Sequence, residues 1–465
     1  MISSTSAWRS GSARSGIALL LVLLAVAAVQ LVAFWPGIMI WDAIRQYRQS
    51  LSGVYDDWHP PAMNWLWRQL LSIHSGPAPM LVLQALLYWG GFALLAATTL
   101  RQGRRLLAAA ILSCALLPIP FVLTGAVLKD SLMAGALLLA SGLIAWRREE
   151  EWPLRIAAIL LLIAAATLRF NAVPACLPLL VFALPAAWRR TWRHLLLTTM
   201  IAAVPLVLAM PVANKLLHAQ HSGVELSLVI YDLGGIGKYA GIDTFPPIDV
   251  ADPVAVNAQC YKPVSWDAYA WWGPAPCPIG FTKLQPAFAA RHINPYVFWA
   301  KTIVAHPVAY AEHRLAHFNS NSRFLVRDAD LPTLSLQTDP NPWNFALAPS
   351  PLRDALGAIA IWSGHTPLGW PICWLALGLG VLIIALGQPG KTIALPMALS
   401  AWAYGMSYLP LSVASEVRYH FWTMSGIALA TVILLADART ISRRRLALAI
   451  LPLLVVVILC VTARI

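Results

Sequence analysis

Long apolar stretches constrain the fold of this chain more than any other feature of its sequence. A helix needs about 20 apolar residues to cross the hydrocarbon core of a bilayer. Eleven segments of the 465-residue chain reach or approach that length. They lie near residues 16–36, 77–100, 105–123, 129–146, 153–169, 171–188, 194–213, 366–387, 391–411, 417–436 and 446–463. The sequence therefore predicts an all-α polytopic membrane protein with about eleven transmembrane helices.

The composition agrees with a lipid environment. Hydrophobic residues make up 59% of the chain and charged residues 11%, whereas a soluble domain carries about 25% charged residues. Disordered chains are poor in apolar and aromatic residues, so the same values argue against disorder. The 21 Trp residues agree as well, because Trp favours the interface between membrane and water.

The positions of the basic residues predict the orientation. Sixteen lie in connections on one side of the expected membrane and seven in short connections on the other. The larger set comprises Arg9, Arg14, Arg101, Arg104, Arg105, Arg147, Arg148, Arg155, Arg189, Arg190, Arg193, Lys391, Arg439, Arg443, Arg444 and Arg445. The positive-inside rule places this set and the N-terminus in the cytoplasm, and the C-terminus outside. The net charge of +13 is thus mostly a cytoplasmic arginine fringe, and we expect no nucleic-acid partner.

The expected spans divide the chain into three parts. Residues 1–213 form an N-terminal transmembrane module, whose first exterior loop covers residues 37–76. Residues 214–365 form an exterior loop, and residues 366–465 form the C-terminal transmembrane helices.

The long exterior loop predicts a small α-rich subdomain, because a loop of this length is too long for a passive connector. Its first part is rich in Gly and Pro and predicts turns with short elements, and two helices are expected between about 283 and 320. Cys260 and Cys277 both lie in this loop. An oxidising exterior compartment would allow a disulfide between them.

The first exterior loop concentrates unusual residues. The segment from residue 34 to 70 reads FWPGIMIWDAIRQYRQSLSGVYDDWHPPAMNWLWRQL. It predicts an amphipathic helix over about 40–51, a Ser-Gly turn, and a second helix that opens at Pro60 and Pro61, because proline is tolerated in a first helical turn. Three aromatic residues fit helices that lie along the membrane surface, namely Trp58, Trp65 and Trp67. The polar candidates of this loop are Asp42, Asp56, Asp57 and His59.

Other polar residues are expected at the same membrane face. They are Lys129, Asp130, Arg169, Asn171, Glu416, Arg418, Tyr419 and His420. Any one of them alone would be interpreted as a charge that extends from a span end to water. Two carboxylate clusters and three cations on one face of one membrane instead favour a functional site.

The segment GGIGK at 234–238 is similar to part of a phosphate-binding loop. It lacks the full GxxxxGK[ST] pattern and has Tyr239 where Ser or Thr is needed. We interpret it as a tight turn.

His313 and His317 are spaced to share one face of a helix, with Glu312 beside the first of them. Such a pair can bind a metal. The sequence reads HRLAH rather than HExxH, which argues against a hydrolytic zinc site.

The polar inventory fits transfer of a sugar from a polyprenyl phosphate. The phosphate is already a competent leaving group, so the site needs one carboxylate to accept the proton of the acceptor hydroxyl and cations to hold the departing phosphate. Asp42, Lys129, Arg169 and Arg418 supply these groups.

The first loop resembles that of the glycosyltransferase-C superfamily. The resemblance rests on Trp41-Asp42 followed by Asp57-Trp58-His59-Pro60-Pro61. The nearest patterns are those of the protein O-mannosyltransferases and the lipid-A aminoarabinose transferases. Uncharacterised bacterial members look closer still, with elements that correspond to His59-Pro60, Lys129-Asp130 and Arg418-Tyr419. The Asp-Glu pair common in the mannosyltransferases is Asp42-Ala43 here. This departure weakens any inference about the same substrate or about a divalent cation such as Mg²⁺ or Mn²⁺, and the cofactor is left open.

This resemblance implies a role for each candidate residue. Asp42 would be the general base of an inverting single displacement, Asp57 a second carboxylate that positions the acceptor or a cation, and His59 a residue that orders the loop. Asp57 can equally be a helix N-cap before Pro60. The donor site would comprise Lys129, Asp130, Arg169, Asn171, Glu416, Arg418 and Tyr419, with Glu416 orienting Arg418.

The same resemblance implies partners and a location. The donor would be a polyprenyl-phosphate-linked sugar, and the acceptor a glycolipid, a glycan or a protein. The chain would lie among the lipids of a bacterial inner membrane with its active face outside. Two alternatives stay open: a flippase or transporter for a lipid-linked glycan, whose polar residues would lie near mid-span, and a glycan polymerase or ligase, which would rely on exterior Arg and His.

Overall fold

The computed structural model describes residues 4–146, 151–272, 276–327, 330, 334–386, 393–436 and 441–465. Within these ranges the regular structure is helical, and backbone pairing between extended segments is limited to isolated bridges. Four of the basic residues used to predict orientation lie outside the described residues, namely Arg147, Arg148, Lys391 and Arg439.

Every predicted apolar segment contains a helix. Ten segments each hold one main helix: α1 (Ser4–Phe34), α4 (Ala78–Arg101), α7 (Lys129–Trp146), α8 (Trp152–Ala166), α9 (Val173–Ala183), α10 (Trp192–Leu216), α17 (Pro371–Ala385), α18 (Ala394–Leu411), α19 (Phe421–Leu435) and α20 (Arg443–Thr462). The segment 105–123 is instead divided into α5 (Arg105–Cys114) and α6 (Pro118–Leu123). Pro118 explains the division, because a proline disfavours helical backbone at the residue before it, and Leu117 has a ψ of 124°.

Four of the described helices, α4, α7, α10 and α20, are long and apolar enough to cross a membrane. Five further apolar helices are shorter. Helices α10 and α20 leave many large apolar side chains exposed, and a large exposed apolar surface marks contact with a membrane or a partner. These helices indicate a helical membrane protein, and the count of about eleven crossings stays a prediction.

The described chain divides into two compact units. The first comprises Met1–Gln220, Thr333–Gly405 and Arg418–Val457. The second comprises His221–Pro332, Met406–Val417 and Ile458–Ile465.

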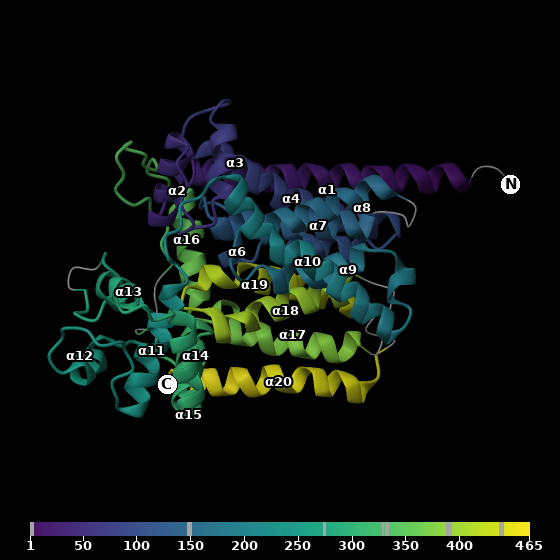
Figure 1. Cartoon of the computed structure of the whole chain (residues 1–465). Coiled ribbons are helices and arrows are strands. Elements are labelled where there is room, and N and C mark those ends of the chain that lie inside the picture. Colours follow the sequence, from purple (N-terminus) through teal and green to yellow (C-terminus); the bar gives the residue numbers. More distant parts are fainter. Residues whose placement is uncertain are drawn as a thin grey trace. The chain divides into compact units, whose positions relative to one another are not determined.

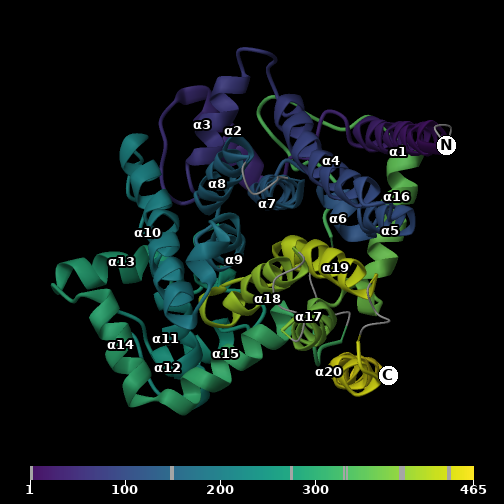
Figure 2. The same ribbon diagram turned by 90° about the vertical axis from the view of Figure 1, so that its right-hand side faces the viewer.

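In the first unit, α4 and α7 pack along each other closely, and Figures 1 and 2 show α1, α4, α7 and α8 side by side. Small residues permit this approach, as is common between membrane helices. A Cβ added to Gly142 of α7 would lie 2.9 Å from the Cβ of Leu94 and 3.0 Å from the carbonyl oxygen of Gly91. The tight pairing fixes the position of α7, whose first two residues are Lys129 and Asp130.

The first loop folds into the two predicted helices, α2 (Trp41–Ser52) and α3 (Ala62–Leu70). Trp65 is exposed, as expected for a surface position. Trp67 is fully buried, and its indole N–H donates to the carbonyl oxygen of Gly76 at 3.0 Å. The predicted surface position of Trp67 is therefore wrong, because α3 turns this ring toward Tyr47 of α2, with the ring centroids 5.1 Å apart.

The second unit is built around α11 (Leu226–Ala240). Four helices pack against it: α12 (Pro253–Cys260), α13 (Phe281–Ala290), α14 (Pro295–Ala305) and α15 (Pro307–Asn321). The region 283–320 thus holds parts of three helices rather than the predicted two. The first predicted helix is interrupted between Ala290 and Pro295, so that α13 and α14 are separate. Cys260 and Cys277 are joined by a disulfide, with a Cα–Cα distance of 5.7 Å. Helix α16 (Pro351–Gly364) belongs to the first unit.

Candidate active site

Backbone pairing brings the starts of α2 and α7 together. The N–H of Ile38 donates to the carbonyl oxygen of Gly125 at 3.1 Å, and the N–H of Val127 donates to that of Ile38 at 2.9 Å. Because α2 begins three residues after Ile38 and α7 begins two residues after Val127, Asp42 and Lys129 enter the same space.

A buried glutamine of α4 fixes this pairing from behind. The side-chain amide of Gln84 donates to the carbonyl oxygen of Ala126 at 2.9 Å and accepts from the N–H of Leu128 at 3.1 Å. Gln84 is fully buried, so it satisfies backbone groups that water cannot reach. The sequence did not single out this residue, since a lone polar residue within an apolar span carries no local signal of its partner.

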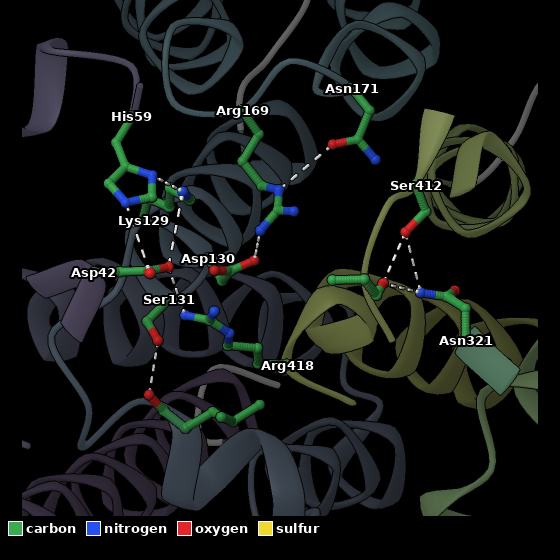
Figure 3. Close-up of polar contacts among 12 residues, drawn as sticks. Asp42, His59, Lys129, Asp130, Ser131, Arg169, Asn171, Asn321, Ser412 and Arg418 are labelled. Carbon is green, nitrogen blue, oxygen red and sulfur yellow. Dashed lines mark hydrogen bonds and ion pairs between the residues drawn. The ribbon is translucent and has the colours of Figure 1, made fainter. Parts of the chain in front are cut away.

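Three side chains surround the carboxylate of Asp42 (Figure 3). An Nη1 atom of Arg418 lies 3.0 Å from Oδ2, and Nζ of Lys129 lies 3.9 Å from the same oxygen. Nε2 of His59 lies 3.6 Å from Oδ1. The side chain of Asp42 is 24% exposed, and its three neighbours are 9–13% exposed. The structure therefore brings together four of the residues that the sequence predicted to share one site.

The contact between His59 and Lys129 fixes the tautomer of the imidazole. Nζ of Lys129 lies 2.7 Å from Nδ1 of His59. An ammonium group only donates, so Nδ1 accepts and the ring proton lies on Nε2, which faces Asp42. Burial, followed by the charge of Lys129, lowers the pKa of His59 to about 3. His59 is therefore neutral near pH 7.

The charge of Asp42 is held by its neighbours. Burial by itself would raise the pKa of this carboxyl, but the charges of Arg418 and Lys129, with His59 beside them, outweigh burial and hold that pKa well below its usual range. The carboxylate is ionised, and it is a weak base while these cations contact it.

A second ion pair adjoins the first. Arg169 pairs with the buried carboxylate of Asp130, and its Nε donates to Oδ1 of Asn171 at 3.4 Å (Figure 3). The guanidinium of Arg169 also lies 4.5 Å from the ring centroid of Tyr419, which the guanidinium of Arg418 approaches at 5.4 Å. The tyrosine ring thus links the two arginines through cation–π contacts.

Asp57 and its neighbour Asp56 both lie in the loop before α3. The role of Asp57 as a second carboxylate at the site stays a prediction. The N–H of Asp57 donates to the carbonyl oxygen of Gln220 at 3.0 Å. The interpretation of Asp57 as an N-cap is wrong, because α3 has Pro61 at that position and no side-chain cap. Asp56 instead pairs with Arg45 at 2.6 Å and accepts from the N–H of Trp58 at 3.0 Å. This short-range turn orders the loop that carries His59.

Glu416 was expected beside Arg418. It lies in the segment Met406–Val417, which belongs to the second unit. Its role in orienting Arg418 stays a prediction.

The donor set around Asp42 suits an anion better than a metal ion. Mg²⁺ and Mn²⁺ prefer oxygen ligands, whereas the groups within 4 Å of Asp42 are nitrogen donors from Arg418, Lys129 and His59. Among the described residues, no group of three or more His, Cys, Asp or Glu side chains is placed to hold a metal.

The histidine pair of α15 is part of a buried polar core in the second unit. Nε2 of His313 donates to Oδ1 of Asp232 at 2.9 Å, and the indole N–H of Trp299 donates to Oδ2 of the same carboxylate at 2.8 Å. Arg314 also pairs with Asp232. Nδ1 of His317 donates to the carbonyl oxygen of Pro263 at 2.7 Å. These contacts indicate a structural core rather than a pair of metal ligands.

The segment GGIGK lies inside α11, so its interpretation as a tight turn is wrong. Its glycines make room for the polar core. A Cβ added to Gly235 would collide with the ring of His313, and one added to Gly234 would collide with the hydroxyl of Tyr269. The sequence pattern is therefore one of close packing, not of phosphate binding.

Comparison with protein-family models, curated proteins and solved structures found no match for the chain. The resemblance of the first loop to the glycosyltransferase-C superfamily thus stays a prediction.

Proposed function

We propose that the protein is a membrane glycosyltransferase that moves a sugar from a polyprenyl-phosphate donor to an acceptor at the exterior face. One observation carries this proposal: the ionised carboxylate of Asp42 is in contact with two cations, Arg418 and Lys129. A carboxylate beside cations supplies both the base and the phosphate-binding groups that such a transfer needs.

The charge of the cluster supports an anionic donor. The two adjoining ion-pair groups contain three cations and two carboxylates, and His59 beside them is neutral. The cations are Lys129, Arg169 and Arg418, and the carboxylates are Asp42 and Asp130. At neutral pH this leaves one positive charge in a site whose side chains are mostly buried. A sugar linked through a single phosphodiester carries one negative charge, which would neutralise the site. Such neutralisation favours binding, because an unpaired buried charge is costly.

Donor binding would also activate the base. Oxygens of the donor phosphate would compete with Asp42 for Arg418 and Lys129, and the pKa of Asp42 would rise as these contacts weaken. The acceptor hydroxyl would then give its proton to Asp42 while its oxygen attacks the anomeric carbon. The bond from that carbon to the phosphate oxygen breaks, the phosphate keeps the electron pair, and the anomeric configuration is inverted.

The remaining residues would hold these groups in place. His59 accepts from Lys129 and so directs the ammonium group toward the site. Asp130 neutralises Arg169, which in turn contacts Tyr419 beside Arg418. We therefore assign direct phosphate binding to Arg418 and Lys129, and a supporting role to Arg169.

The proposal is tested by replacing Asp42. In a strain that lacks the gene, we expect one surface glycolipid or glycoprotein glycan to be lost, as measured by mass spectrometry. Wild-type protein restores it, and Asp42→Ala does not, although the variant reaches the membrane at the normal level. Asp354→Ala is the matched control, because this carboxylate is 72% exposed on α16, and it restores the glycan.

Other outcomes would contradict the proposal. If Asp42→Ala restored the glycan, Asp42 would not be the general base. A normal set of surface glycans, with a lipid-linked sugar retained on one leaflet of the deletion strain, would identify a flippase instead. Loss of glycan length alone would identify a polymerase.

A further inference from the structure

An extended segment of the first unit runs along the helix that carries Asp42. Residues 334–350 lead into α16, and their half-buried and exposed side chains largely alternate. We refer to residues 334–350 as the strap. Its backbone is restricted by three prolines, because the proline ring fixes the φ angle. They are Pro340, Pro342 and Pro349.

The strap is bonded to the start of α2. Oδ2 of Asp339 accepts from the N–H of Trp41 at 2.8 Å. The N–H of Asp339 donates to the carbonyl oxygen of Met39 at 2.9 Å, and Oγ1 of Thr338 accepts from the N–H of Met39 at 3.2 Å. Three hydrogen bonds thus join two strap residues to the turn that opens the helix.

These bonds replace a cap that α2 lacks. The residue at its N-cap position is Ile40, which has no side-chain acceptor. The first N–H groups of a helix have no partner within the helix, and a carboxylate at this end also interacts favourably with the helix dipole. Asp339 supplies that carboxylate from a position 298 residues further along the chain.

The strap contacts α2 again about halfway along the helix. The ring of Tyr47 lies 4.8 Å from that of Trp343 and 5.4 Å from that of Phe345. Asn341 shapes this part of the strap, because its Oδ1 accepts from the N–H groups of both Trp343 and Phe345. Asp42 therefore lies on a helix that is held at its first residue and again at Tyr47.

We propose that Asp339 is a positioning residue for Asp42, and that the strap holds α2 where the carboxylate can meet both the cations and the acceptor. The catalytic part of this inference rests on the proposed function. A 12-residue helix is marginal by itself in water, so contacts from outside must define where it begins. A displacement of about 1 Å at a reacting group can lower a rate by about 100-fold.

Two substitutions separate the cap from the charge. Asp339→Ala removes the acceptor, whereas Asp339→Asn keeps an oxygen that can accept from Trp41, since Asn caps helices about as well as Asp. We expect Asp339→Ala to lower the rate of glycan formation in isolated membranes at least 10-fold. Asp339→Asn should stay within about threefold of wild type, and Asp354→Ala should have no effect.

Two further measurements make the test specific. Hydrogen exchange followed by mass spectrometry should show faster exchange in residues 39–47 of Asp339→Ala and no change in α4 or α7. The acid limb of the pH–rate profile should also move to higher pH in this variant, because Asp42 would lose part of its contact with Arg418. A general loss of stability would move neither quantity selectively.

Each result decides a different point. Unchanged exchange in residues 39–47 would overturn the claim that Asp339 holds α2. Faster exchange with a normal rate would overturn its link to catalysis, provided that Asp42→Ala is inactive. An active Asp42→Ala would overturn the proposed function and the catalytic part of this inference, and the exchange data would still decide whether the strap holds the helix.

Discussion

On the proposed function, the same two side chains, Arg418 and Lys129, would restrain Asp42 as a base and offer a site for phosphate. While Arg418 and Lys129 contact Asp42, the carboxylate is ionised but accepts a proton poorly. On the proposed function, the donor would relieve this restraint when its phosphate binds. Base strength would then depend on donor occupancy, and the base would become effective only when there is a sugar to transfer.

His59 makes the stability of the first unit depend on pH. Its folded pKa of about 3 lies below the value of about 6.5 for an unfolded histidine. The unfolded chain therefore binds a proton below about pH 6.5 that the folded chain does not bind until about pH 3. The contribution of His59 to the free energy of unfolding is therefore complete above about pH 6.5, and it decreases as the pH falls from about 6.5 to about 3.

We expect His59→Gln to reduce that dependence. Unfolding in detergent, measured from pH 7.5 to 4.5, should show a smaller loss of stability per pH unit in the variant than in wild type. His317, whose pKa burial also lowers to about 3, will keep its own contribution. His74→Gln is the control, because His74 is exposed. Equal slopes for wild type and His59→Gln would contradict the prediction.

At the scale of single elements, α11 depends on glycine for its packing rather than for a turn. Gly235→Ala places a methyl group against the ring of His313, which is fully buried and bonded to Asp232. Overpacking of this kind costs about 1–3 kcal/mol. We expect a lower melting temperature and faster proteolysis of the second unit.

Gly90→Ala provides the comparison for that substitution. Gly90 lies within α4, and an added Cβ would make an ordinary contact of 3.5 Å with Leu139. Alanine is the better helix former, so this variant should be neutral or slightly more stable. A Gly235→Ala protein as stable as Gly90→Ala would show that the polar core can shift to accept the methyl group.

The elements themselves were largely predictable, and their partners were not. Apolar length placed a helix in every expected span, and the amphipathic pattern placed α2 and α3. The glycines of α11 and the cap from Asp339 were missed for one physical reason. Local patterns report which face of an element is buried, but they do not report that Gly235 lies against His313, or that Trp41 is bonded to Asp339, 298 residues away.

At the scale of the whole molecule, the scarcity of charge made the candidate site visible in the sequence. With 11% charged residues, a group of carboxylates and cations at one expected membrane face stood out, and the structure brings Asp42, His59, Lys129 and Arg418 together. The pairing of Arg169 with Asp130 was not predictable, because span ends give no distance between side chains.

The orientation can be tested over the whole chain. The excess of basic residues predicts that the connection around Gly103 is cytoplasmic, and that His74, Ser222 and the C-terminus are exterior. Alkaline phosphatase is active only after export, so fusions at His74, at Ser222 and at the C-terminus should be active. A fusion at Gly103 should be inactive.

A second measurement checks the same orientation without a fusion. The disulfide between Cys260 and Cys277 requires an oxidising compartment. In protein from intact cells, these two thiols should therefore react with a maleimide only after reduction and denaturation. A cysteine placed at Ser222 should react with a membrane-impermeant maleimide in cells whose outer membrane has been permeabilised. A cysteine placed at Gly103 should react only after the cells are lysed. An inactive fusion at Ser222, together with a protected cysteine there, would place the second unit in the cytoplasm. The predicted exterior location of the second unit would then be wrong.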